Sequence, residues 1–343
     1  MMKPILSTAI LGLAITAALA SQRVSAADTD AVLIVTASNQ SANELMFYAP
    51  SGQMINAIPT QGQGGVGGNS GGIAASHGRI AVVNFGSGNV SLFAAEGERG
   101  SYRMVQLIQA LASPVSVAFG HEHLYILSTT HVESHPISRS HVGAVDGSAP
   151  LLLRDGSAAQ VGVAGGQLVF TEKAGDIETV NLAGSGAIKS AATAVAGGTS
   201  LAAPFGLVTR GNDAYVTVAH SNEVSLVRNN AVLASAGTGK QMAPCWATLD
   251  GAFLFTANSP SHSVSRFAVY GQHMILDAEV ATTFSGAPTD IDYRAGFAAV
   301  VDADATTSRV SVFKVDEDGN MTLNGVATIN SPKTNGVAVL TQD

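Results

Sequence analysis

A unit of 40–45 residues recurs along this chain, and it restricts the possible folds more than any other feature. The clearest copy runs from Pro244 to Phe267 and reads PCWATLDGAFLFTANSPSHSVSRF. Asp250-Gly251 is a tight-turn pair between two apolar runs, and Ser263–Phe267 alternates polar with apolar residues. Such alternation is typical of a half-buried β-strand. The unit therefore predicts a β-meander.

Related copies begin at regular intervals. They start after Gly72, Pro114, Ala159, Pro204, Pro244, Pro288 and Pro332. The alternating strand recurs at residues 89–93, 223–227, 263–267 and 309–313. Propeller blades of four antiparallel strands have this length, whereas helical repeats would show a period of about 3.6 residues, which we do not find. The spacing therefore favours a β-propeller.

The two ends of the chain supply an incomplete unit each. Residues 31–60 contain three strands without an innermost one, and Gly336–Leu340 is a strand without partners of its own. Pairing of this last strand with residues 31–36 would close the ring and hide two open edges. We therefore predict an all-β, seven-bladed β-propeller of four-stranded antiparallel blades, which forms a single domain over residues 27–343.

The first 26 residues have the pattern of a cleavable signal peptide. Lys3 gives a basic start, residues 5–20 are uncharged, and small residues precede Ala27. The alternative is a membrane anchor, but the apolar segment is shorter than the about 20 residues that a spanning helix needs. The sequence predicts an exported protein, periplasmic or extracellular, with no membrane insertion after cleavage. We expect a monomer. An internal disulfide cannot form, since Cys245 is the only cysteine.

The charge balance argues against nucleic-acid partners. The chain has 17 basic and 25 acidic residues, and no basic stripe overrides this average. The glycine-rich segment 61–72 fits G-x-G-x-x-G at residues 62–67, but neither a preceding strand nor a following helix accompanies it. We interpret it as a flexible connector between two blades. No cofactor is expected.

The longest connection between a second and a third strand lies at residues 130–141, and we expect it on the face where the inner strands begin. The candidate catalytic residues of this predicted loop are His131, Glu133, His135, Arg139 and His141. A histidine can act as a general base, and Arg139 can stabilise an oxyanion. A solvated polar loop and a transition-metal site remain alternatives, although H-x-E-x-H is not the helical zinc motif.

Other polar or aromatic residues are expected at the same face. The candidate ligand-binding residues are Trp246, His220, Asn258, His262 and Asp302. Loop solvation is the alternative for the polar members, and core packing is the alternative for Trp246.

The segments Pro244-Cys245-Trp246-Ala247, Phe253–Asn258 and Val264–Phe267 resemble the lactonase-type seven-bladed β-propellers, which include 6-phosphogluconolactonase-like and carboxy-muconate-cyclase-like proteins and are related to the YVTN-repeat proteins. The resemblance implies a propeller fold and opening of a lactone. Family members often carry an Arg-His pair just after the proline that begins an inner strand. The corresponding pairs here are Cys245-Trp246, Phe205-Gly206, Val115-Ser116 and Thr289-Asp290.

Three functions therefore stay open at this point. The first is an exported lactonase-like hydrolase that acts at the central funnel. The second is a non-catalytic propeller that binds a small molecule or an envelope protein, and the third is a structural or redox-accessory role in the envelope. The fold alone does not separate them.

Overall fold

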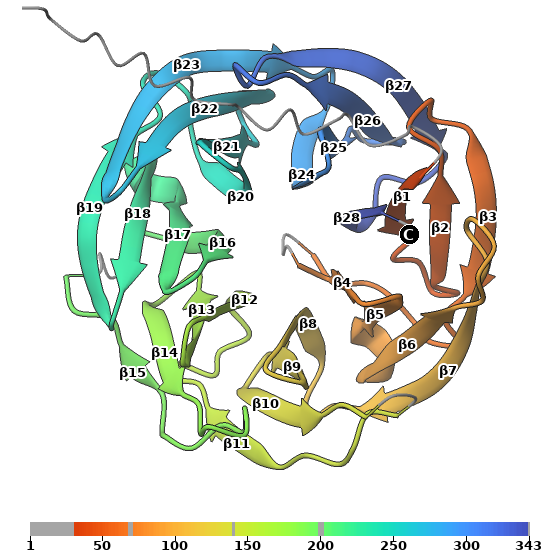
Figure 1. The fold of residues 1–343 in the computed structure, drawn as a ribbon, viewed down its shortest axis with the longest axis vertical. Coiled ribbons are helices and arrows are strands. Elements are labelled where there is room, and N and C mark those ends of the chain that lie inside the picture. The colour runs from red at the N-terminus through yellow and green to blue at the C-terminus, as the bar shows by residue number, and fades with distance from the viewer. Residues whose placement is uncertain (1–30, 68–70, 139–140, 198–201, 342–343) are drawn as a thin grey trace, which may run out of the picture.

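The computed structural model describes residues 31–67, 71–138, 141–197 and 202–341, and the strands of these residues form a ring of seven four-stranded sheets (Figure 1). Neighbouring strands in each sheet are antiparallel. The predicted seven-bladed propeller is therefore confirmed. The predicted signal peptide lies outside the described residues.

The strands of each blade are given from the ring axis outward. Blade one contains β28 (Asn335–Thr341), β1 (Val32–Ala37), β2 (Glu44–Tyr48) and β3 (Met54–Pro59); blade two contains β4 (Ile73–Ser76), β5 (Arg79–Asn84), β6 (Asn89–Ala95) and β7 (Tyr102–Gln109). Blade three contains β8 (Pro114–Gly120), β9 (His123–Ser128), β10 (His131–Pro136) and β11 (Gly147–Pro150); blade four contains β12 (Ala158–Ala164), β13 (Gln167–Glu172), β14 (Ile177–Asn181) and β15 (Thr193–Ala194).

The remaining blades follow the same order. Blade five contains β16 (Pro204–Arg210), β17 (Asp213–Val218), β18 (Glu223–Arg228) and β19 (Ala231–Gly237). Blade six contains β20 (Pro244–Asp250), β21 (Phe253–Asn258), β22 (Ser263–Tyr270) and β23 (His273–Thr283). Blade seven contains β24 (Ala287–Arg294), β25 (Phe297–Ala303), β26 (Ser308–Val315) and β27 (Met321–Ile329). The 3₁₀ turns η2 (Phe85–Ser87) and η3 (Ala219–Ser221) each connect a second strand to a third.

Burial follows the position of a strand in its blade. Every residue of the second strands β1, β9 and β17 is buried, because the neighbouring blades cover both faces of the sheet. The outer strands β3 and β19 alternate between exposed and half-buried residues. The apolar core therefore lies between the blades. Among the described residues, no helix has the length and apolar character needed to cross a bilayer.

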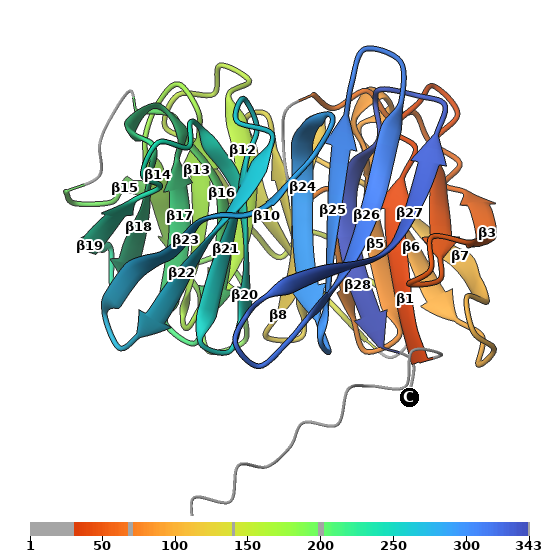
Figure 2. The same cartoon turned by 90° about the horizontal axis from the view of Figure 1, so that it is seen from above.

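The C-terminal strand closes the ring as predicted. β28 pairs with β1 from Val32↔Thr341 to Ala37↔Asn335, and the two strands lie side by side in Figures 1 and 2. The Thr36 hydroxyl donates a hydrogen bond of 2.6 Å to the carbonyl of Gly336. The N- and C-terminal parts of the described chain thus share one sheet, in which β28 covers the inner edge of β1.

Aspartates of blade seven join the other side of β28. The Asp290 carboxylate accepts the Val337 N–H at 3.1 Å, and the Asp292 carboxylate accepts the Val339 N–H at 2.8 Å. Elsewhere around the axis a neutral side chain makes the equivalent contact: Gln160 Oε1 accepts the Leu207 N–H at 2.7 Å. The closing strand is therefore held by a backbone ladder on one edge and by two carboxylates on the other.

Candidate ligand-binding site

Two cavities follow one another along the ring axis. The mouth cavity, of about 300 Å³, is lined by Asn39, Gly65, Val66, Gly67, Trp246, Thr289, Pro332, Lys333, Thr334 and Asn335. The channel cavity, of about 270 Å³, is lined by residues further along three of the same inner strands, Ala247, Asp290 and Val337, together with other inner-strand residues. The mouth cavity therefore lies at the face where the inner strands begin, which we call the mouth face, and the opposite face is the exit face.

Asn39 organises the wall of the mouth cavity. Its Oδ1 accepts the N–H groups of Gly65 and Val66 at 2.6 and 3.1 Å. Its Nδ2 donates to the carbonyls of Val66 and Lys333 at 2.7 and 2.9 Å. Asn39 has a φ of 53°, in the left-handed region that asparagine tolerates better than most residues. One side chain thus joins the glycine-rich segment to the segment that precedes β28.

The glycine-rich segment connects blade one to blade two, as predicted, and its described residues 61–67 are held by hydrogen bonds. The N–H of Gly64 donates to the Gln40 carbonyl at 2.7 Å, and the Gly86 N–H donates to the Gly64 carbonyl at 3.0 Å. A Cβ at Gly64 would lie 2.4 Å from the Asn39 carbonyl carbon. The glycine is therefore needed for close backbone packing, and residues 61–67 form an anchored part of the mouth.

Three polar side-chain atoms at the mouth cavity are buried without a hydrogen-bond partner in the described part of the chain. They are Trp246 Nε1, Thr334 Oγ1 and Asn335 Nδ2, and their residues are 4%, 2% and 7% exposed. Buried polar groups are nearly always paired in folded proteins, because desolvation without a partner is costly. Lys333, which is exposed, adds a cation at the edge of the same cavity. Such an arrangement suits a ligand that supplies hydrogen-bond acceptors.

Trp246 was expected either in the core or at a ligand, and the structure places it in contact with both the core and the mouth cavity. Its ring packs edge-on against Phe205, with centroids 5.5 Å apart. The Lys173 ammonium lies 5.2 Å from the Phe205 centroid, and burial lowers the pKa of Lys173. Burial raises the pKa of Cys245 to about 12, and this thiol donates to the Ala243 carbonyl. The thiol is therefore protonated at neutral pH and is a poor nucleophile.

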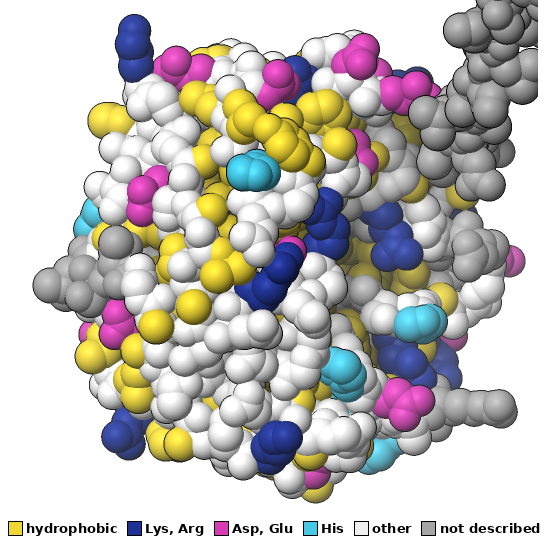
Figure 3. All heavy atoms as spheres, turned by 60° about the vertical axis from the view of Figure 1, so that its left-hand side comes forward, with side chains coloured by type: hydrophobic (Ala, Val, Ile, Leu, Met, Phe, Trp, Pro, Cys, Tyr) yellow, Lys and Arg dark blue, Asp and Glu magenta, His cyan; other side chains and the backbone are white. Residues whose placement is uncertain are grey.

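The channel cavity differs from the mouth cavity because two acidic side chains, Asp290 and Asp292, line it. Burial raises the pKa of Asp290 to about 8 and that of Asp292 to about 6, while their backbone hydrogen bonds act in the opposite direction. Arg294 lines the same cavity near the exit face. Figure 3 shows Lys and Arg side chains around the hollow in the middle of this face. The axis is therefore lined by donors at the mouth, carboxylates in the channel and cations toward the exit.

The prediction that residues 130–141 form a loop at the mouth face is wrong. Residues His131–Pro136 form β10, the third strand of blade three, and not a loop at the mouth face. The spacing of His131, Glu133 and His135 is the period of a strand, so these residues lie on one face of the sheet. The long connection of this blade instead follows β10 and leads to β11, and its described residues, 137–138 and 141–146, lie toward the exit face.

The individual candidates have structural partners. Glu133 is fully buried and accepts the Leu111 N–H at 3.2 Å. His135 is 2% exposed; its Nδ1 contacts the Gly143 carbonyl at 3.0 Å, and its Nε2 lies 3.8 Å from Glu133. His131 Nδ1 contacts the Thr130 hydroxyl, and His141 is exposed on the connection to β11. Arg139 lies outside the described residues. The structure does not bring the four described candidates to either cavity.

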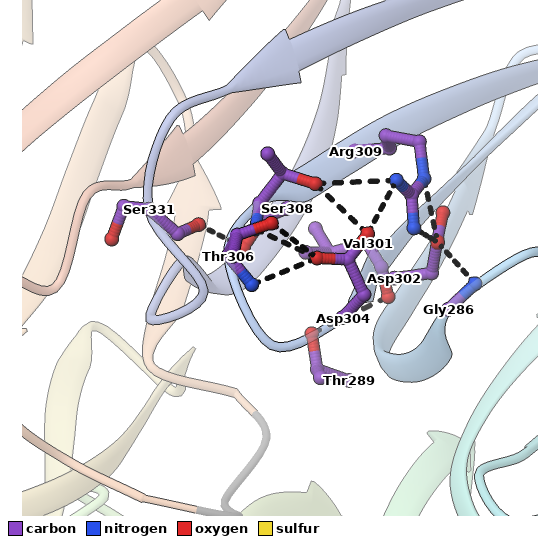
Figure 4. Close-up of polar contacts among 10 residues, drawn as sticks. Gly286, Thr289, Val301, Asp302, Asp304, Thr306, Ser308, Arg309 and Ser331 are labelled. Atoms are coloured by element: carbon purple, nitrogen blue, oxygen red, sulfur yellow. Dashed lines mark hydrogen bonds and ion pairs between the residues drawn. The ribbon is translucent and has the colours of Figure 1, made fainter.

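Two of the candidate ligand residues stabilise their own blade. Asp302 is 1% exposed, accepts the Gly286 N–H at 3.0 Å and pairs with Arg309 at 2.9 Å (Figure 4). Asn258 is fully buried and donates to the hydroxyls of Ser263 and Ser265 at 3.1 and 2.8 Å. Each side chain ends a second strand and is bound by the strand that follows. Neither lines the two cavities.

The remaining candidates, His220 and His262, are exposed at turns between second and third strands. The His220 N–H donates to the Ala202 carbonyl, and His262 has a φ of 52°. They lie toward the mouth face but line neither cavity. Of the predicted ligand residues, the structure therefore places Trp246 alone at the mouth cavity.

Asn39, Lys333, Thr334 and Asn335 were missed by sequence reasoning. The signal that could have found them was the chain closure itself, since the last three directly precede the closing strand predicted at Gly336–Leu340. Within the described ranges, no three histidine, cysteine, aspartate or glutamate side chains are grouped closely enough to hold a metal ion.

A buried pair of glutamates lies apart from both cavities. Glu172 and Glu178 of blade four are fully buried, and burial together with the neighbouring Glu172 carboxyl raises the pKa of Glu178. The two side chains accept the N–H groups of Leu152, Leu153 and Arg154. This pair fixes the entry into β12 and is a structural feature of the blade.

Comparisons with known proteins identify the architecture. No protein-family model and no curated protein matches the chain. Among solved structures, candidate 6-phosphogluconolactonases from Bacteroides uniformis and Bacteroides fragilis have TM-scores of 0.63 and 0.65 at 14% identity; they align over 90% and 91% of this chain and 99% of their own. A Lactobacillus plantarum protein gives 0.67 at 13% identity, over 90% and 99% of the two chains. The chain shares the fold of the lactonase-type propellers.

Proposed function

We propose that this protein binds a small, oxygen-rich molecule in the mouth cavity of a lactonase-type propeller. The observation that carries the proposal is that Trp246, Thr334 and Asn335 line one cavity and that each has a buried polar atom, Nε1, Oγ1 and Nδ2, without a partner among the described residues. A ligand that offers acceptor oxygens would satisfy all three groups. The cavity, of about 300 Å³, suits a compact molecule.

Trp246 provides a direct test because it is the only tryptophan of the chain. Selective excitation of tryptophan therefore reports on the mouth cavity without interference from another indole. Lactones and small hydroxy acids should change its emission and raise the melting temperature. Thr334→Val should reduce the thermal shift, whereas Thr322→Val, on the exposed outer strand β27, should leave it unchanged. A panel without any emission or thermal response would contradict the proposal.

A second candidate function is lactone hydrolysis, which the candidate 6-phosphogluconolactonases of the same fold favour. With a pKa near 6, Asp292 would be mostly ionised at neutral pH and could take a proton from water. Water would then attack the ring carbonyl, donors at the mouth would stabilise the oxyanion, and the ring C–O bond would break as its oxygen gains a proton.

The kinetic test compares two bases. Asp292→Asn should abolish the turnover of a lactone panel, and the wild-type rate should rise with pH and level off above about pH 6. His135→Ala is the comparison, because this histidine is buried within blade three. Hydrolysis that survives Asp292→Asn and is lost in His135→Ala would place the base in blade three. Absence of turnover in the wild type would leave binding as the function.

We further propose that the protein acts outside the cytoplasm, as a periplasmic or extracellular protein. The support is the leader-like pattern of residues 1–26. Mass spectrometry of the protein from its native host should find Ala27 as the N-terminus. An intact N-terminus in a soluble cell extract would contradict export.

A further inference from the structure

We infer that the ligand of the mouth cavity is a monoanion, and that its carboxylate is held by Trp246, Asn335 and Thr334 beside Lys333. This inference rests on the proposed binding function and adds the charge and the chemical class of the ligand. It follows from which donor and acceptor groups of the lining residues have hydrogen-bond partners in the protein and which do not.

The free groups are mainly donors. An indole N–H only donates, an amide NH₂ group donates two hydrogen bonds, and a hydroxyl can donate one. Trp246 Nε1 and Asn335 Nδ2 are of the first two kinds, and Thr334 Oγ1 is of the third. A carboxylate accepts only, and its two oxygens can take about four hydrogen bonds. The free groups of the cavity and a carboxylate are therefore complementary.

The Asn39 side chain of the lining is already engaged at both its acceptor and its donor atoms, and the Thr289 hydroxyl has used its hydrogen. Asn39 Oδ1 takes two backbone N–H groups, and its amide nitrogen is bound to two carbonyls. The Thr289 hydroxyl donates to the Val301 carbonyl at 3.3 Å (Figure 4). Among the described lining residues of the mouth cavity there is no carboxylate. A cationic ligand would therefore find no counter-charge there, whereas an anion would find donors.

The charge of the lining favours one negative charge over two. Lys333 is the one cation among the described lining residues, and the other free groups are neutral. The whole chain has a net charge of −8, and Asp290 and Asp292 line the next cavity along the axis. A phosphate dianion would therefore be under-compensated, since a buried charge needs a partner. Asp292, whose pKa is about 6, is ionised at neutral pH and would also keep an anion at the mouth.

A matched pair of probes separates charge from shape. γ-Butyrolactone and 4-hydroxybutyrate have the same carbon skeleton, but only the second carries a carboxylate, and inorganic phosphate is the third probe. In titrations of the full chain followed by Trp246 emission, 4-hydroxybutyrate should bind about tenfold or more tightly than the lactone. Its affinity should fall as salt is added, because the Lys333 contribution is exposed to solvent.

Variants assign the contacts. Lys333→Gln should weaken 4-hydroxybutyrate binding by roughly twofold to fivefold, as expected for a solvent-exposed charge. Asn335→Asp places a negative charge against the carboxylate and should abolish measurable binding. Lys189→Gln, an exposed lysine that lines neither cavity, is the matched control and should have no effect. If Asn335→Asp fails to fold, the exposed Lys333 variant still decides the result.

The outcomes separate the inference from the proposed function. Tighter binding of the lactone or of phosphate than of 4-hydroxybutyrate would overturn the inferred class and would leave binding in the mouth cavity supported. Equal effects of Lys333→Gln and Lys189→Gln would overturn the role of Lys333. If no probe changes the emission or the melting temperature, both the inference and the proposed function fail.

Discussion

The mouth cavity and the channel cavity are lined by neighbouring residues of the same inner strands, yet their polar groups differ in whether they have hydrogen-bond partners. In the channel, Asp290 and Asp292 each accept a backbone N–H of the closing strand. At the mouth, Trp246 and Asn335 of inner strands β20 and β28 carry buried donors without a partner among the described residues. The first set completes the ring, and the second set is left for a ligand.

This difference shows that a perturbed pKa alone does not identify a binding site. The largest shifts belong to carboxyls such as Asp290 and Glu178, which are bound to backbone N–H groups. Ion-pair and hydrogen-bond networks that stabilise a fold perturb pKa values as strongly as active sites do. The missing partners of the mouth donors are the more specific signal. Four predictions test this contrast.

The largest effect is expected from removal of the closing strand. Deletion of residues 334–343 would expose the edge of β1 and leave Asp290 and Asp292 without their N–H donors. Since domains are stable by only about 5–15 kcal/mol, we expect loss of cooperative unfolding and aggregation. Calorimetry and light scattering measure both. A truncated protein with an unchanged melting temperature would contradict the role assigned to β28.

The second effect is on the pH dependence of stability. The Asp290 carboxyl has a pKa of about 8 in the folded protein, whereas an unperturbed aspartate has a pKa of 3.8. Between these values the unfolded chain releases the proton and the folded chain keeps it. Rising pH therefore favours unfolding, and stability should fall by a few kcal/mol from about pH 4 to pH 8.

Asp290→Asn removes this titration. The variant should lose less stability than the wild type over the same pH range in urea unfolding experiments. Asp318→Asn, in the exposed turn between β26 and β27, is the matched control and should keep the wild-type slope. Parallel curves for Asp290→Asn and the wild type would show that Asp290 ionises normally in the folded protein.

The third effect concerns the wall of the mouth. Asn39→Ala would remove four hydrogen bonds and place an alanine at a φ of 53°, so we expect a loss of about 2–4 kcal/mol in the free energy of unfolding. Asn39→Gly loses the same bonds but tolerates the backbone, and it should be about 1 kcal/mol more stable than the alanine variant. Chemical denaturation of both measures the difference. Variants of wild-type stability would argue against Asn39 as the anchor.

The smallest effect on stability is expected at Trp246. Its Nε1 has no partner among the described residues to lose, so Trp246→Phe should cost only about 1 kcal/mol through the change in ring size. Tyr125→Phe is the comparison, because the Tyr125 hydroxyl donates to the Gly186 carbonyl at 2.8 Å, and removal of this donor leaves a buried acceptor unpaired. Ligand affinity, measured by the thermal shift, should fall in the Trp246 variant and stay unchanged in the Tyr125 variant.

Much of the fold could be predicted because local pattern and burial agree. The alternating strands predicted at residues 89–93 and 263–267 lie within β6 and β22, and the unpaired terminal strand correctly predicted closure. The prediction for β10 failed because its buried face carries Glu133 and His135 in place of apolar residues. At the position of Glu133, four other blades have a serine, Ser91, Ser225, Ser265 or Ser311.

The candidate site was much less predictable. Trp246 stood out as a unique aromatic residue at the start of an inner strand. Thr334 and Asn335 are ordinary polar residues in the sequence. They become candidates because their side-chain atoms are buried without a partner in the described chain, which only the three-dimensional structure shows. Asn39 contacts residues 65, 66 and 333, which are far from it along the chain, so no local pattern indicates its role.

The position of Thr334 and Asn335 at the beginning of β28 has a thermodynamic consequence. A ligand bound to these two residues contacts the strand that closes the ring. Ligand binding and β28–β1 pairing are therefore linked by mass action. In the ligand-bound protein β28 should therefore separate from β1 less often than in the free protein. The amide hydrogens of β1 and β28 should exchange more slowly when a ligand occupies the mouth cavity.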